Sequence, residues 1–226
     1  YLFLLLFFLI GSFSSLNVGI SHDEYHEQAN WEFNLNLTKK ISSEFFLNKN
    51  SGLKIENYKD KYYGIGFQLI SQPIQYFLKD FILKYQNISE YGSKLVSKHF
   101  VVFLFFFISG IFFYLIIKRI IKDKNFCYLA TILYFLYPYL FGQSLFNSKD
   151  IPFMTLWLIC SYSSFSLFEK LSKKKIIRPL KIIVLGILTA YLFSIRISGI
   201  LILLQYFISF LIFLKKTKIK FNDFFI

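Results

Sequence analysis

Cysteine is nearly absent from this chain of 226 residues. The two cysteines, Cys127 and Cys160, lie inside or at the ends of hydrophobic segments, where they resemble small apolar core residues. They do not predict a disulfide pair, and no cysteines have the spacing of a metal site. The chain also lacks a small-residue cleavage site after its first hydrophobic segment. That segment is therefore predicted to remain as a helix and not to be removed as a secretory signal.

Acidic residues are also scarce: 13 Asp and Glu stand against 26 Lys and Arg, which gives a formal net charge of +13. Many of the basic residues form three groups, each directly behind a hydrophobic segment. These groups are Lys118, Arg119, Lys122 and Lys124; Lys170, Lys173, Lys174, Lys175, Arg178 and Lys181; and Lys215, Lys216, Lys218 and Lys220. Basic loops stay on the cytoplasmic side of a membrane. The charge therefore predicts topology, and no nucleic-acid partner is needed to explain it.

Long hydrophobic runs dominate the rest of the sequence. A helix needs roughly 17–25 apolar residues to cross the hydrocarbon core of a bilayer. We predict an all-α, polytopic membrane bundle of about six transmembrane helices. The segments are about Tyr1–Val18, His99–Ile117, Phe126–Phe146 and Ile151–Phe168, followed by two short helices within Leu180–Leu214 that meet near Arg196. Pro138 is expected to loosen the third of them.

These segments predict a single membrane domain over residues 1–226. Helix 1 occupies residues 1–20, an extracytoplasmic loop residues 21–97, helices 2–6 residues 98–214 and a cytoplasmic tail residues 215–226. The chain does not begin with Met, and its tail ends without a closing domain. We therefore expect it to be the N-terminal part of a longer protein.

The extracytoplasmic loop is too long for a passive connection. Within Gly64–Tyr85, apolar residues recur at three- and four-residue intervals, and Asn30–Leu47 has a similar but less regular pattern. Both are predicted to be helices in the membrane interface that roof an outward-facing cavity. The alternative for Gly64–Tyr85 is a helix packed inside a small extramembrane cap.

An acidic cluster, SHDEYHEQ, begins this loop. On a helix, Asp23 and Glu27 stand four residues apart, as do His22 and His26, so they form neighbouring stripes. The two histidines are secondary site candidates, because HxxxH is half of a zinc-protease signature. That signature has Glu directly after its first His, where this chain has Asp23. The alternative without chemistry is a helix cap at Ser21 or Asp23.

Two further polar features fall on the same predicted side of the membrane. In NSKDIP, Lys149 and Asp150 precede Pro152 at the start of a predicted helix, where a simple helix cap is the alternative. In SIRISG, Arg196 interrupts an otherwise apolar stretch. Such an arginine is costly and is a functional-site hypothesis by default, paired with a carboxylate or a phosphate. Snorkelling to the membrane surface is its alternative.

In order and topology, these features resemble the GT-C class of membrane glycosyltransferases, in particular its protein O-mannosyltransferase and aminoarabinose-transferase branch. The resemblance rests on the Asp23-Glu24 pair behind helix 1, the long loop with YYG at Tyr62–Gly64, the NSKDIP turn and the RISG junction. It spans nearly the whole chain. It implies transfer of a mannose-like sugar, with inversion, from a polyprenyl- or dolichyl-phosphate donor to a hydroxyl of a protein, lipid or glycan outside the cytoplasm.

The resemblance also implies roles for individual residues. Asp23 and Glu24 would be catalytic, with Asp23 engaging the acceptor. Arg196, and more weakly Lys149, would face the phosphate of the lipid donor. Asp150 resembles a second-loop acidic position that in some members helps to bind a divalent metal. A divalent metal ion held by Asp150 together with Asp23 is therefore an expected cofactor.

The chemistry asks for the same residue types. An attacking hydroxyl needs a carboxylate to take its proton, and the departing phosphate needs a cation, which a guanidinium supplies through two bonds. A transporter or a non-enzymatic membrane assembly protein is the alternative function, and a metalloprotease is less favoured. A transporter should show ionisable residues near mid-span and repeated halves, which are not evident. The expected location is a bacterial inner membrane, or the endoplasmic reticulum membrane in a eukaryote.

Overall fold

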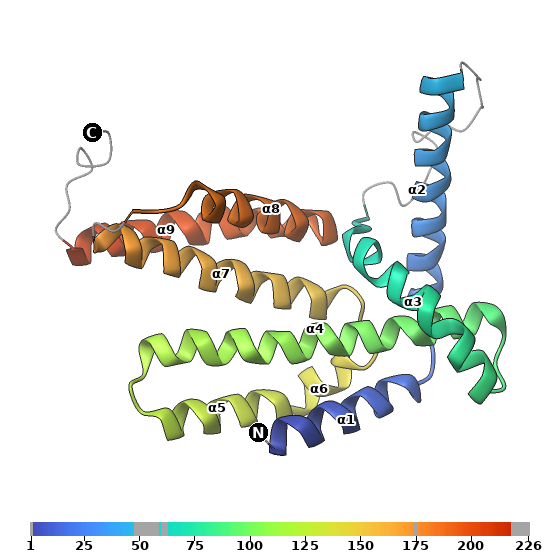
Figure 1. Cartoon of the computed structure of the whole chain (residues 1–226), viewed down its shortest axis with the longest axis horizontal. Helices are drawn as coiled ribbons and strands as arrows, with labels where there is room; N and C mark the ends of the chain where they lie inside the picture. The colour runs from blue at the N-terminus through green and yellow to red at the C-terminus, as the bar shows by residue number, and fades with distance from the viewer. Residues whose placement is uncertain (1, 48–58, 60–62, 174–175, 218–226) are drawn as a thin grey trace. The chain divides into compact units, whose positions relative to one another are not determined.

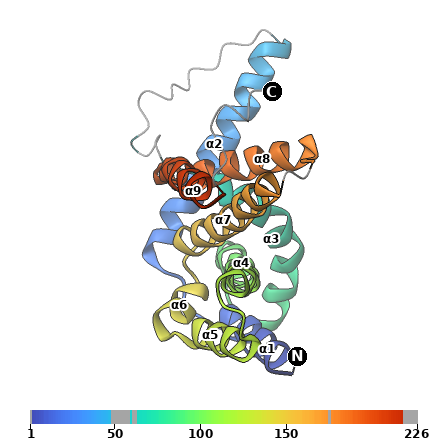
Figure 2. The ribbon, with the colours of Figure 1, turned by 90° about the vertical axis from the view of Figure 1, so that its left-hand side faces the viewer.

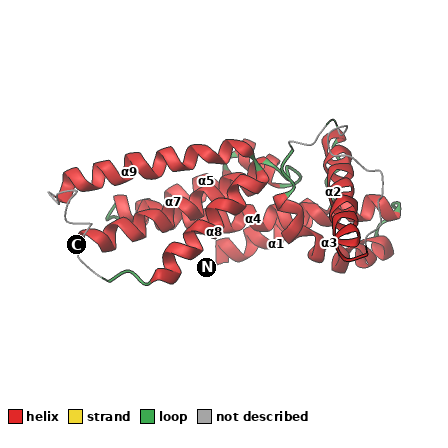
Figure 3. Ribbon diagram, turned by 90° about the horizontal axis from the view of Figure 1, so that it is seen from above, coloured by secondary structure: helices red, strands yellow, loops and turns green. Residues whose placement is uncertain are grey.

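The computed structural model describes residues 2–47, 59, 63–173 and 176–217, and among these residues helices are the only regular elements (Figure 1; Figure 3). This confirms the predicted all-α class. The elements in chain order are α1 (Leu2–Leu16), α2 (His22–Leu47), α3 (Gly66–Tyr85), α4 (Glu90–Ile120), α5 (Lys124–Leu136), α6 (Pro138–Ser144), α7 (Asp150–Ser172), α8 (Pro179–Ile195), the 3₁₀ turn η2 (Ile197–Ile200) and α9 (Leu201–Thr217). Tyr62 and residues 218–226 of the predicted tail lie outside the described residues.

The chain packs as two compact units. Unit 1 comprises Tyr1–Phe103 and Leu145–Ser148, and unit 2 comprises Leu104–Ser144 and Lys149–Ile226. The long helix α4 therefore gives its first half to unit 1 and its second half to unit 2. The single membrane domain over residues 1–226 stays a prediction.

Three helices within the described part of the chain are long and apolar enough to cross a membrane: Glu90–Ile120, Asp150–Leu171 and Ile197–Lys215. Two shorter apolar helices, Leu2–Leu16 and Pro179–Ile195, correspond to the first and fifth predicted segments. The chain is thus a polytopic helical membrane protein. The total of about six spans stays a prediction.

The third predicted segment is not one helix. α5 ends at Leu136 and α6 begins at Pro138, while Tyr137 between them has extended backbone angles (φ −64°, ψ 114°). Proline lacks a backbone N–H and disfavours helical geometry in the residue before it. The continuous helix predicted over Phe126–Phe146 is therefore wrong, because Pro138 breaks it instead of loosening it.

The break predicted near Arg196 is present. α8 ends at Ile195, Arg196 has extended backbone angles (φ −146°, ψ 134°), and η2 leads into α9. The Arg196 N–H donates to the Leu192 carbonyl at 3.3 Å, and the Gly199 N–H donates to the Arg196 carbonyl at 2.9 Å. The prediction of two short helices meeting at this charge is confirmed.

In unit 2, the second half of α4 lies between α5 and α7 (Figure 2). The Thr155 hydroxyl of α7 donates to the Phe105 carbonyl of α4 at 3.0 Å. On the α5 side, a Cβ added to Gly110 would lie 2.0 Å from the Phe135 ring. Small residues let membrane helices approach this closely. Gly110 is therefore a packing residue of the α4–α5 contact.

Gly110→Leu is expected to lower the stability of unit 2 by about 1–3 kcal/mol, because overpacking forces the buried Phe135 ring or the α5 backbone to move. Thermal unfolding of the purified protein in detergent measures the change. The matched control is Gly186→Leu on α8, where nothing lies within 4 Å of an added Cβ. Equal unfolding temperatures for the two variants would contradict this account of α4–α5 packing.

Helix α3, in unit 1, turns its polar side inward. Gln68, Ser71 and Gln75 are buried, and the Gln75 amide donates to Ser71 Oγ at 2.9 Å and to Gln68 Oε1 at 3.2 Å. Its apolar stripe faces outward, with Phe77 82 % exposed and Phe81 also exposed. The predicted helix within Gly64–Tyr85 is confirmed, although it begins at Gly66. An outward apolar stripe suits contact with lipid, and the location in the membrane interface stays a prediction.

Candidate functional site

The acidic cluster forms the first turns of α2, which continues without a break through the second predicted loop helix to Leu47. Glu24 Oε1 accepts the backbone N–H of Ser21 at 2.8 Å. This is the arrangement of a capping box, in which the third helical residue reaches back to the cap. Asp23 and Glu24 also place negative charge in the first turn, which favours a helix N-terminus. One role of this cluster is therefore to cap the N-terminus of α2.

Asp23 differs from its acidic neighbours in its surroundings. Its side chain is exposed, and among the described residues its carboxylate has no hydrogen-bond or ion-pair partner. His22 and His26 are also exposed, and their rings meet edge to face with centroids 5.1 Å apart. An exposed carboxylate without a partner can accept a proton from a bound molecule without breaking an existing contact.

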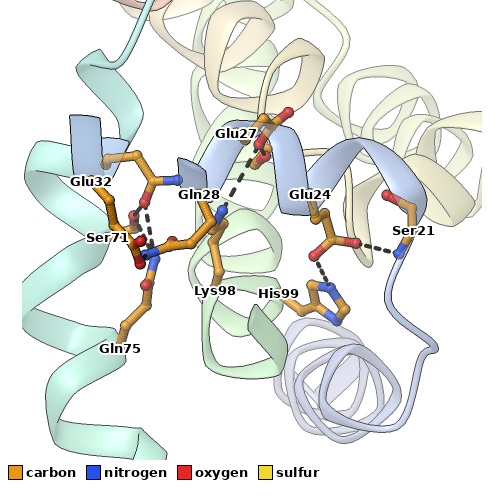
Figure 4. A network of polar contacts seen from close by, with 11 residues as sticks. Ser21, Glu24, Glu27, Gln28, Glu32, Ser71, Gln75, Lys98 and His99 are labelled. Atoms are coloured by element: carbon orange, nitrogen blue, oxygen red, sulfur yellow. Dashed lines mark hydrogen bonds and ion pairs between the residues drawn. The ribbon is translucent and has the colours of Figure 1, made fainter. Parts of the chain in front are cut away.

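Glu24, by contrast, is buried in unit 1, where it points toward His99 and Ser21 (Figure 4). It is 2 % exposed, and its Oε2 lies 2.7 Å from Nε2 of His99, which is fully buried. His99 Nδ1 lies 3.2 Å from the carbonyl oxygen of Ser15 near the end of α1. One imidazole on α4 therefore connects α1 to the first turn of α2.

A second charged contact joins α2 to α4 in unit 1. Glu27 Oε2 lies 3.9 Å from Nζ of Lys98, whose side chain is fully buried (Figure 4). Glu27 Oε2 also accepts a hydrogen bond from the hydroxyl of Ser148, in the NSKD segment. Burying charges is expensive unless they are paired. Glu24 and Glu27 are thus both engaged by α4, which leaves Asp23 as the open carboxylate of this turn.

Lys98 and His99 are not among the site residues predicted from the sequence. The signal that could have found them is their position directly before the uncharged run of α4, because ionisable residues at the edge of a membrane helix often have a partner. Nothing in that pattern names the partner, however. Glu24 and Glu27 precede them by more than seventy residues.

In unit 2, Arg196 pairs with a carboxylate. Its Nη1 donates to Oδ1 of Asp150, the first residue of α7, and the two side chains are 43 % and 50 % exposed. Lys149 precedes α7 and makes no side-chain cap bond to it. Exposed ion pairs contribute only about 0–1 kcal/mol to stability. The pair therefore contributes little to the fold, and its half-exposed guanidinium is accessible to an anion.

The predicted site residues fall into both units. Asp23 and Glu24 belong to unit 1, whereas Lys149, Asp150 and Arg196 belong to unit 2. Asp150 and Arg196 are in contact, and Glu27 in the cluster contacts Ser148. The convergence of Asp23, Asp150 and Arg196 on one face of the membrane stays a prediction.

The surroundings of Asp150 bear on the predicted divalent metal ion. No three His, Cys, Asp or Glu side chains group together as metal ligands within the part of the chain that the structure describes. The Asp150 carboxylate is bound by a guanidinium, which competes with a cation for the same oxygen. The Asp150 carboxylate is thus engaged by Arg196, and a divalent ion held by Asp150 together with Asp23 stays a prediction.

Comparison with known proteins identifies the family. The family of dolichyl-phosphate-mannose-protein mannosyltransferases matches residues 88–225, more than half of the chain. This region contains α4 to α9, including Lys98, His99, Asp150 and Arg196, but not the acidic cluster on α2. No curated protein and no solved structure matches the chain. With its apolar helices and this match, the chain belongs to the dolichyl-phosphate-mannose-protein mannosyltransferase family of the GT-C class and is a membrane glycosyltransferase.

Proposed function

We propose that the chain transfers a mannose-like sugar from a polyprenyl- or dolichyl-phosphate carrier to an acceptor hydroxyl on the extracytoplasmic side, with inversion at the anomeric carbon. The observation that carries this proposal is the exposure of the Asp23 carboxylate, which has no partner among the described residues. The neighbouring carboxylates Glu24 and Glu27 are both bound by residues of α4. A group-transfer reaction at a hydroxyl needs such a base.

In the proposed reaction, the acceptor oxygen attacks the anomeric carbon from the face opposite the phosphate. Its proton passes to the Asp23 carboxylate as the new carbon–oxygen bond forms. The bond between the anomeric carbon and the carrier phosphate breaks, and the phosphate leaves with the electron pair. Attack from the opposite face inverts the configuration at this carbon.

Arg196 is proposed to bind the carrier phosphate. A planar guanidinium can hold two phosphate oxygens at once, and its positive charge stabilises the charge that builds up as the phosphate departs. Asp150 holds one edge of this guanidinium and fixes its direction. Lys149, adjacent in the chain, is a second and weaker candidate for the same phosphate.

The exposed surface of unit 2 supports a lipid-linked donor. Large apolar side chains on α8 and α9 are exposed, among them Ile187, Phe207 and Ile212. Such a surface is in contact with lipid tails when the helices span a membrane. The carrier tail can then remain in the bilayer while its phosphate reaches the half-exposed Arg196.

The donor is tested with the purified full chain in liposomes. Labelled mannose is supplied in one of three donors: linked to dolichyl phosphate, linked to a polyprenyl phosphate, or linked to a nucleotide. Peptide, lipid and glycan acceptors that carry hydroxyl groups are added. We expect labelled mannose to be transferred from the two lipid-linked donors and not from the nucleotide sugar. The anomeric configuration of the product should be opposite to that of the donor. A preference for the dolichyl carrier would favour an endoplasmic reticulum location, and a preference for the polyprenyl carrier would favour a bacterial membrane. Transfer from the nucleotide sugar, or retention of configuration, would contradict the proposal.

A further inference from the structure

The contact between Glu24 and His99 lies where three helices of unit 1 meet. Glu24 belongs to the first turn of α2, His99 to α4 and Ser15 to the end of α1. Both ionisable side chains are almost completely buried, and they point toward one another (Figure 4). Every polar atom of the two side chains has a partner, because Glu24 Oε1 accepts the Ser21 N–H, Oε2 faces His99 Nε2, and His99 Nδ1 faces the Ser15 carbonyl.

The partners determine where the protons lie. A carbonyl oxygen can only accept, so Nδ1 of His99 carries a proton and donates it to Ser15. Nε2 and Glu24 Oε2, 2.7 Å apart, then need one more proton between them. The pair is therefore either imidazolium with carboxylate or imidazole with carboxylic acid. In both forms its net charge is zero, which suits a buried location.

From this geometry we infer that Glu24 and His99 are positioning residues for Asp23, and that Glu24 does not itself take part in the chemistry. The inference rests on the proposed role of Asp23 as base. Glu24 has no free oxygen and almost no exposure, so it offers nothing to a substrate. It holds the first turn of α2 at a point one residue from Asp23. A displacement of about 1 Å at a reacting group can cost roughly 100-fold in rate.

A glutamine at position 24 can reproduce every contact of the pair. Its amide oxygen accepts the Ser21 N–H in place of Oε1, and its amide N–H donates to His99 Nε2 while Nδ1–H still donates to Ser15. The substituted pair is neutral, like the native one. Glu24→Gln therefore preserves positioning, although it would abolish the action of a catalytic carboxylate.

The test compares Glu24→Gln with Glu24→Ala in the liposome assay, with kcat and the KM for the donor measured separately. We expect Glu24→Gln to stay within about threefold of the native kcat, since neutral hydrogen bonds replace the native ones. Glu24→Ala should lose about 100-fold in kcat, with the donor KM unchanged, because the loss lies in the placement of Asp23. Thermal unfolding in detergent verifies that the variants fold.

His99 supplies a matched pair of variants. The amide of Gln lies near the position of Nε2 and can still donate to Glu24, whereas the amide of Asn lies near Nδ1 and reaches only the Ser15 carbonyl. We expect His99→Gln to lose less than about tenfold in kcat, and His99→Asn about 100-fold, because it leaves a buried carboxyl group without its partner.

Two results would overturn the inference. A folded Glu24→Gln protein as inactive as an Asp23→Asn protein would make Glu24 a catalytic group, and a fully active Glu24→Ala protein would show that no positioning is needed. Either result leaves the proposed function intact. If instead Asp23→Asn is fully active, the role of Asp23 fails, and with it this inference. If Glu24→Ala does not fold, the activity of Glu24→Gln decides alone.

Discussion

Replacing Asp23 by asparagine is expected to reduce sugar transfer about 10²–10⁴-fold, which is the usual contribution of a general base. The amide keeps the size of the side chain but cannot take the acceptor's proton. Asp23 is exposed and has no partner among the described residues, so little of the fold depends on its charge. The variant should therefore accumulate in the membrane and have the same unfolding temperature as the unsubstituted protein. The loss should appear in kcat, measured with labelled lipid-phosphate donor.

The control for Asp23→Asn is Glu32→Gln. Glu32 is another exposed carboxylate on α2, and it is held by the Gln28 amide at 3.0 Å. Its neutralisation should leave kcat unchanged. Full transfer activity in Asp23→Asn would refute the proposed mechanism, and equal losses in the two variants would point to the general charge of α2 instead of to one base.

The second large effect is expected at Arg196. Arg196→Ala should raise the KM for the lipid-phosphate donor about 10- to 100-fold, because hydrogen bonds to charged groups contribute about 1.5–3 kcal/mol. The substitution also leaves the Asp150 carboxylate without the cation that it contacts here, so that it repels the phosphate. The donor KM of Arg196→Lys should lie between those of the unsubstituted protein and Arg196→Ala, since lysine keeps the charge but cannot form the bidentate contact with phosphate.

Arg119→Ala is the matched control for Arg196→Ala. Arg119 also forms an ion pair between helices of unit 2, with Glu169 at 3.6 Å. It belongs to the first basic group, which is predicted to face the cytoplasm. Its removal should leave the donor KM unchanged, and neither variant should lose much stability, because exposed pairs contribute little. An unchanged donor KM in Arg196→Ala would assign Arg196 a structural role at the membrane surface.

Much of the fold was predictable because helix formation in a membrane depends on local properties. Long apolar runs predicted α1, α4 and α7, and the charge of Arg196 predicted the break between α8 and α9. The third segment failed for a local reason too, since the effect of Pro138 on the residue before it was underestimated. Helix α3 was predicted from the three- and four-residue spacing of its apolar residues. That spacing did not predict that its polar side faces inward.

The sequence by itself determined the class of this protein, its helices and the residue types that sugar transfer needs. These follow from composition, period and order along the chain. Only the tertiary structure decided which carboxylate is open. Asp23, Glu24 and Glu27 lie within five positions of one another, and no local property separates them. Their roles differ because α4 brings His99 to Glu24 and Lys98 to Glu27, and contacts over such distances in the chain arise only when the helices pack.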